Sequence, residues 1–164
     1  MLKWAREQGC QWDDQTFYCA VSSGDLEMLT WLKENGCPWG CCTCSAAAYP
    51  GDRKLLAWLR YHGIPWGDDF FTTGVIGGCV DVLKWAIANG CPIPGPDEIR
   101  QPCVTAARMG VWEMLKWLVQ NGFPVNEDVC SIVAESNLEM LQWLRENECP
   151  WDESLCCGMH SRET

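Results

Sequence analysis

Residues 25–39 read DLEMLTWLKENGCPW, and this stretch decides the fold. Asp25 can cap the start of a helix, and the apolar residues that follow it recur at helical spacing. Gly36 then supplies the left-handed residue that commonly ends a helix, and Pro38 cannot continue one. The stretch therefore predicts a short helix that ends at a glycine and is followed by a tight loop.

The centre of this stretch, Leu29-Thr30-Trp31, is one of six Leu-x-Trp triplets. Their tryptophans, which we call the marker tryptophans, follow one another at intervals of 27, 27, 27, 32 and 26 residues. A fixed period of about 20–50 residues is typical of a repeat array, in which each unit buries its apolar face on its neighbours. The marker tryptophans are Trp4, Trp31, Trp58, Trp85, Trp117 and Trp143.

The segment before residue 25 predicts another helix in the same unit. Residues 13–16 begin with capping and acidic residues, and Phe17, Ala20 and Val21 form an apolar stripe of helical period. Residues 22–25 then break this helix. We expect each unit to contain a first helix, a tight turn, a second helix that carries the marker tryptophan, and a loop.

Residues 24–37, GDLEMLTWLKENGC, resemble the second half of the ankyrin repeat, whose pattern is Gly-His-Leu-Glu-Val-Val-x-Leu-Leu-x-x-Asn-Gly-Ala. The family's alanine pair is matched at 47–48 and 106–107. The resemblance implies an all-α, ankyrin-type solenoid of antiparallel helix pairs with short loops, in about six repeats of period 26–32 residues. It also implies a non-catalytic scaffold that binds a protein partner through its concave, loop-bearing face. The family's turn glycine is matched at Gly24, Gly51, Gly78 and Gly110.

The chain departs from the family pattern in length and composition. Most units are about six residues shorter than the usual ~33, because the β-hairpin finger before the first helix is nearly missing. The sequence therefore resembles a short-finger variant rich in Trp and Cys, similar to arrays encoded by protists and their giant viruses. Leucine-rich repeats also have periods near ~27 residues and are the rival architecture, although their Leu-x-Leu strand core is absent. The family's histidine position holds Tyr18, Ser45, Thr72, Val104 and Ser131.

Residues 1–164 are expected to form a single array with incomplete repeats at both ends. The chain begins within a second helix at Leu2 and ends within a first helix near residues 156–160. The incomplete ends have three possible explanations. The chain is a piece of a longer array or the product of a truncated reading frame, which are the two favoured explanations, or its ends form a surface for pairing. Because no apolar run approaches ~20 residues and the start lacks a signal-peptide core, we expect a cytoplasmic or nuclear protein.

The formal net charge of −10 restricts the class of partner. It argues against nucleic acid, which needs a basic protein face, and against adsorption to anionic membranes. We therefore expect an unidentified protein partner with a basic surface. No Ser/His/Asp set, Gly-rich phosphate loop or paired-carboxylate motif stands out from the repeats, so we expect neither an enzyme nor a cofactor.

Thirteen cysteines would suit a disulfide framework, but their number is odd and many recur at equivalent repeat positions. Equivalent residues of stacked helices lie about 8–10 Å apart, which is too far for a bridge. Cys37, Cys41, Cys42 and Cys44 crowd together, but Cys37 and Cys44 recur at equivalent positions of other repeats, so we expect no metal site. A Cys-rich metal-binding or redox module is the alternative function. Cysteines six residues after a marker tryptophan are expected to be small buried residues, and they are Cys10, Cys37, Cys91 and Cys149.

Acidic residues recur where the first helices begin, and they would form an acidic edge on the loop side that attracts a basic partner.

The insertion at 93–102 is either a recognition loop or a tolerated insertion. The marker tryptophans are expected to lie in the core. The loop tryptophans, Trp12, Trp39, Trp66 and Trp151, either have a structural role or serve as anchors for a partner. Trp58→Ala should therefore cost more stability than Trp66→Ala. A truncated repeat fragment without a partner is the remaining alternative. The predicted partner-binding residues are Asp13, Asp14, Trp39, Trp66, Asp68, Asp69, Pro94, Pro96, Asp97, Glu98, Glu127 and Asp128.

Overall fold

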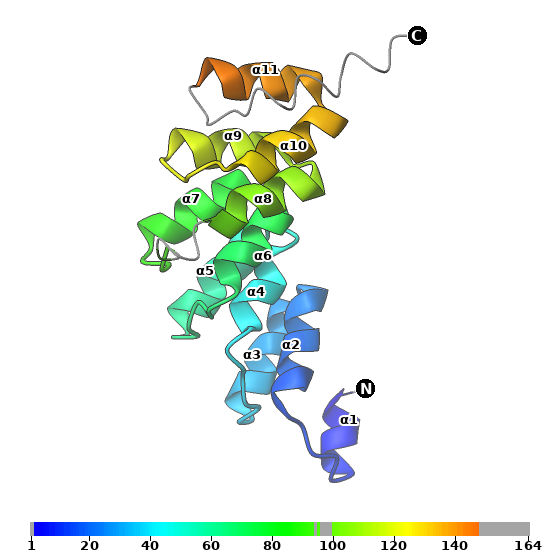
Figure 1. Cartoon of the computed structure of the whole chain (residues 1–164). Helices are drawn as coiled ribbons and strands as arrows, with labels where there is room; N and C mark the ends of the chain where they lie inside the picture. Colours follow the sequence, from blue (N-terminus) through cyan, green and yellow to red (C-terminus); the bar gives the residue numbers. More distant parts are fainter. Residues whose placement is uncertain (1, 94, 96–99, 148–164) are drawn as a thin grey trace. The chain divides into compact units, whose positions relative to one another are not determined.

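The computed structural model describes residues 2–93, 95 and 100–147, and within these ranges the chain is helical, with no strand (Figure 1). The predicted all-α class is therefore confirmed for this part of the chain. None of these helices combines the length and the apolar character needed to cross a membrane. The helices are α1 (Leu2–Glu7), α2 (Asp14–Ser23), α3 (Leu26–Glu34), α4 (Thr43–Ala48), α5 (Arg53–Tyr61), α6 (Phe70–Ile76), α7 (Val80–Ala88), α8 (Arg100–Met109), α9 (Trp112–Gln120), α10 (Glu127–Ser136) and α11 (Leu138–Glu146).

The helix starts follow from the capping residues that the sequence supplies. The Asp25 carboxylate accepts hydrogen bonds from the backbone N–H groups of Glu27 and Met28, both at 3.0 Å. Asp13 caps α2 in the same way and forms a capping box with Thr16. Gly24 lies between α2 and α3 with φ of 70°, a left-handed conformation that glycine adopts without steric cost. The predicted turn between a first and a second helix is confirmed here.

The second helices also end alike, through a side chain that bonds back to the marker tryptophan. Asn35 Nδ2 donates to the Trp31 carbonyl oxygen at 2.8 Å, so the C-cap residue satisfies a carbonyl of the last turn. His62 takes this place in α5, with Nδ1 2.9 Å from the Trp58 carbonyl oxygen, as its position predicts. The other asparagines that repeat the bond are Asn89, Asn121 and Asn147.

The chain divides into two compact units, Met1–Pro92 and Ile93–Thr164, which we describe separately. In the first unit, α2 packs against α4 and α4 against α6, so the first helices form one continuous layer. Each first helix also packs against the second helix that follows it, in the pairs α2–α3, α4–α5 and α6–α7. The core between the helices contains the fully buried side chains Phe17, Leu29, Leu32, Leu56, Leu59, Phe70 and Leu83.

The second unit repeats this pattern. Helix α8 packs against α9 and α10, and α10 packs against α11. Its core contains Met114, Leu115, Leu118, Val129, Val133 and Leu144. Of the insertion at 93–102, the last three residues belong to α8 rather than to a loop. Pro102 fits there because a proline in the first helical turn lacks only an N–H group that has no intrahelical partner.

Most marker tryptophans do not lie in the core, so the prediction was wrong for them, whereas Trp117 is buried as predicted. Trp4 is 65% exposed and Trp58 is only half-buried, whereas the marker leucines, such as Leu56, are fully buried. Residues two apart on a helix point to different sides, so in most triplets the leucine faces the core and the tryptophan is partly exposed. The triplet of α9 is the exception, because Leu115 and Trp117 are both buried. The loop residue Trp66 is more deeply buried than Trp58, so the predicted order of their costs is reversed.

Candidate functional site

The first helices of the first unit form a groove with a volume of about 390 Å³. Three helices and their cap residues contribute to it. The pairs Tyr18 and Ser22 of α2, Ser45 and Tyr49 at α4, and Asp69 and Thr73 at α6 are each four residues apart, a spacing that places side chains on one face of a helix. Most of these side chains carry a hydroxyl group, and one carries a carboxylate. The lining residues are Tyr18, Ser22, Ser45, Ala46, Tyr49, Pro50, Asp69 and Thr73.

Asp69 provides the negative charge of this groove, and Ser45 fixes its position. The Ser45 hydroxyl, which is 4% exposed, donates to Asp69 Oδ1 at 2.7 Å. Asp69 itself is exposed, and it makes no ion pair with another described residue. The carboxylate is therefore held in place by a neutral donor, and its charge is left for a molecule that enters the groove.

Two tyrosines give the same groove an aromatic wall. Tyr49 is 58% exposed, and Tyr18 is half-buried. Tyrosine combines a large apolar face with a hydroxyl group at low entropic cost, which makes it a common residue in protein recognition. A basic side chain could contact Asp69 through its charged group while its stem lies against a tyrosine ring. The groove is thus suited to a basic segment of a protein.

Of the predicted partner-binding residues, only Asp69 lines this groove. Asp13, Asp14 and Asp68 are exposed at or just before the starts of first helices, as the acidic pattern predicts. Glu127 and Asp128 are exposed at the start of α10 in the second unit. Four further predicted residues lie outside the described part of the chain, namely Pro94, Pro96, Asp97 and Glu98.

The two loop tryptophans among the predicted residues differ in exposure. Trp39 is 39% exposed and has only an edge-on contact with Phe17, with ring centroids 6.1 Å apart, so its ring is available to a partner. Trp66 is 5% exposed, and the Arg60 guanidinium lies 4.6 Å from its ring centroid. Its Nε1 is buried and has no hydrogen-bond partner among the described residues. Burial removes Trp66 from any surface that a partner could contact.

Sequence reasoning had not assigned Tyr18, Ser22, Ser45, Tyr49 or Thr73 to a site. Tyr18 and Ser45 occupy the position of the histidine in the ankyrin pattern, but a substitution at one position does not indicate a groove. A usable signal was the spacing of polar and aromatic residues four apart on consecutive first helices, which places them on one face. That signal requires the helices to be aligned with one another first.

Half of the ten described cysteines are buried. Cys10 is exposed, so its assignment as a buried residue was wrong, whereas Cys37 and Cys91 are buried as predicted. Burial raises the pKa of Cys44 to about 12 and that of Cys91 to about 11. Because a thiol must lose its proton to bind a metal or to attack, these groups are poorly suited to either role at neutral pH. The buried cysteines of the described chain are Cys37, Cys44, Cys91, Cys103 and Cys130.

Cys41 and Cys42 are exposed neighbours, with their sulfur atoms 3.5 Å apart. The hydrogen bond with Cys41 and the negative charge of Asp69 raise the pKa of Cys42 to about 11. Within residues 2–93, 95 and 100–147, no three His, Cys, Asp or Glu side chains are grouped so that they could hold a metal ion. The alternative of a Cys-rich metal-binding or redox module stays a hypothesis.

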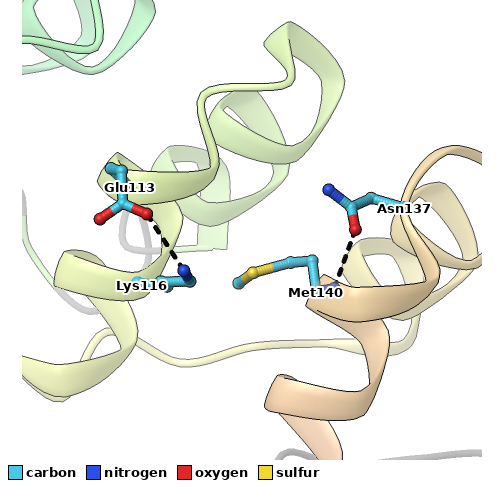
Figure 2. Close-up of polar contacts among 4 residues, drawn as sticks. All are labelled: Glu113, Lys116, Asn137 and Met140. Carbon is cyan, nitrogen blue, oxygen red and sulfur yellow. Dashed lines mark hydrogen bonds and ion pairs between the residues drawn. The ribbon is translucent and has the colours of Figure 1, made fainter.

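A second groove, of about 490 Å³, lies between α9 and α11 in the second unit. Figure 2 shows its central residues: the Met140 side chain extends toward Lys116, whose ammonium group lies 3.0 Å from the Glu113 carboxylate. The Asn137 side chain accepts from the Met140 N–H at 2.9 Å and caps α11. The remaining lining residues are Trp112, Glu139, Gln142, Trp143 and Glu146.

A search against models of protein families found no match to this chain. A search of curated proteins also found none.

Proposed function

We propose that this chain is a non-catalytic protein-binding module, built as an ankyrin-type array of helix pairs, and that its partner presents a basic surface. The observation that carries the proposal is the groove of α2, α4 and α6, in which Ser45 holds the exposed Asp69 carboxylate beside Tyr18 and Tyr49. The groove lies on the first helices, and these form the face that ankyrin-type arrays use for binding.

Two features of the first unit support binding rather than catalysis. The groove contains one carboxylate and neutral hydroxyl groups, without a histidine or cysteine to exchange protons or attack a substrate. The exposed acidic residues at the helix starts add to the negative potential on this side of the unit. That potential would speed encounter with a basic partner and make association sensitive to salt.

The test is site-specific photo-crosslinking. A photoreactive phenylalanine derivative is incorporated in place of Tyr49, in the groove, or in place of Tyr61, which is 87% exposed at the end of α5. Illumination in cells should give a crosslinked protein from position 49 and not from position 61. That product should disappear with Asp69→Asn and persist with Asp81→Asn, a matched change of an exposed aspartate on α7. Equal crosslinking from both positions, or indifference to Asp69→Asn, would contradict the proposal.

A further inference from the structure

Trp112 is the one tryptophan that belongs neither to the marker series nor to the loop series. It lies three residues before the marker leucine of its helix, at the start of α9. The equivalent residue of α5 is Arg53, and the equivalent of Trp143 in α11 is Trp85 in α7. Since the repeats align without a gap across these second helices, the space between α9 and α11 can be compared position by position with that between α5 and α7.

Between α5 and α7, the chain places its own cation on the marker tryptophan. The Arg53 guanidinium lies 5.8 Å from the centroid of the Trp85 ring. This distance is within the range in which a guanidinium is attracted to the face of an indole. Between α9 and α11, Trp112 replaces the arginine, and the indole of Trp143 borders the groove of about 490 Å³, which the side chains of the described residues leave open.

The charges around the two spaces are opposite in sign. The groove between α9 and α11 is lined by three acidic side chains and one basic side chain. Nine equivalent positions of α5 and α7 contain three basic residues and one acidic residue. The one cation in the groove, Lys116, is already paired with Glu113 at 3.0 Å. Glu139 and Glu146 are exposed and make no ion pair with a described residue, so the groove has an excess of negative charge.

We propose that this groove binds an arginine side chain presented by a protein partner, with its guanidinium over Trp143 in the position that Arg53 has over Trp85. Trp112 would cover the aliphatic stem, and Glu139 and Glu146 would accept hydrogen bonds from the guanidinium. Arginine suits such a site better than lysine, because its planar group stacks on an aromatic ring and is more weakly hydrated than an ammonium group. The site is independent of the groove on the first helices, so the two can fail or succeed separately.

The binding test is an NMR titration of the full chain with blocked arginine, N-acetyl-arginine methylamide. The eleven indole N–H signals report separately on each tryptophan, and the variants Trp112→Phe and Trp143→Phe assign the two that matter. Blocked arginine should shift both signals saturably, whereas blocked citrulline, which has the same shape without the charge, should not. Glu139→Gln should weaken binding about three- to fivefold, as expected for the loss of one exposed charge.

A variant that fills the groove from within gives a sharper test. Trp112→Arg restores the arrangement of Arg53 and Trp85 and should abolish the response of the Trp143 signal to blocked arginine, with the helical circular dichroism unchanged. Leu138→Arg, an equal change of charge at an exposed position on α11, should retain the response. Equal shifts from citrulline, equal binding of blocked lysine, or full binding by Trp112→Arg would overturn the proposal. If Trp112→Arg does not fold, unweakened binding by Glu139→Gln overturns it instead.

Discussion

The clearest test of the packing compares one substitution at two equivalent positions, Trp39→Ala and Trp66→Ala. Both residues follow a marker tryptophan by eight positions, yet Trp39 is 39% exposed and Trp66 only 5%. The difference is about a third of a tryptophan surface, or roughly 80 Å² if the whole side chain has about 250 Å². At about 25 cal/mol per Å², this area corresponds to about 2 kcal/mol.

Trp66 also has more partners to lose. Its ring centroid lies 4.7 Å from that of Phe70 and 5.9 Å from that of Trp85, and the Arg60 guanidinium covers one face. We therefore expect Trp66→Ala to lower the free energy of unfolding by about 3–5 kcal/mol, the range for emptying a large buried aromatic site. Trp39→Ala should cost about 2 kcal/mol less. Urea titrations followed by circular dichroism at 222 nm, with equal slopes for both variants, provide the measurement. Equal losses at the two positions would refute this account of the loops.

Three further outcomes are expected. Gly51→Ala should destabilise the protein more than Gly63→Ala in urea titrations, because both have φ near +75° but only the new Cβ at position 51 would collide with a neighbour, Cys79 Sγ. The folded-state pKa of Cys44 is raised above its ordinary 9.0 to about 12, so its contribution to stability is present below pH 9 and is lost as the pH rises toward 12. The free energy of unfolding should therefore fall over this range, and less so in Cys44→Ala. Asn121→Ala should cost about 1 kcal/mol in the same assay, because it removes the bond to the marker tryptophan carbonyl at the end of α9; no loss would show that solvent replaces this bond.

The helices were predictable because their signals are local. Asp25, Gly24 and Gly36 act within three or four residues, so their capping and turn roles can be derived from spacing alone, and the structure confirms them. The cap role of His62 follows from the same local pattern, since this residue occupies the place that an asparagine has in the other repeats.

Burial of the tryptophans was not predictable from the same pattern. A residue that recurs in every repeat is easily taken for a core residue, but a partly exposed side chain can recur in the same way. Trp66 is more deeply buried than Trp58, although the opposite was expected. The path of the loop carries Trp66 into the core, and periodicity does not encode the path of a loop. The groove around Asp69 was missed for a related reason: its walls come from three helices that are separated in sequence, and no single segment shows it.

The nearest-neighbour packing of the helices has a consequence for how this protein acquires its structure. Each principal contact joins helices within one repeat or in the next, such as α4 with α5 and α4 with α6. Such contacts close only short loops, so little entropy is lost before packing begins to stabilise the chain. Folding can start at any helix pair and spread in both directions, and neither unit has to wait for its distant residues to meet. The speed of folding should then depend little on the number of repeats, whereas stability should rise with each repeat added.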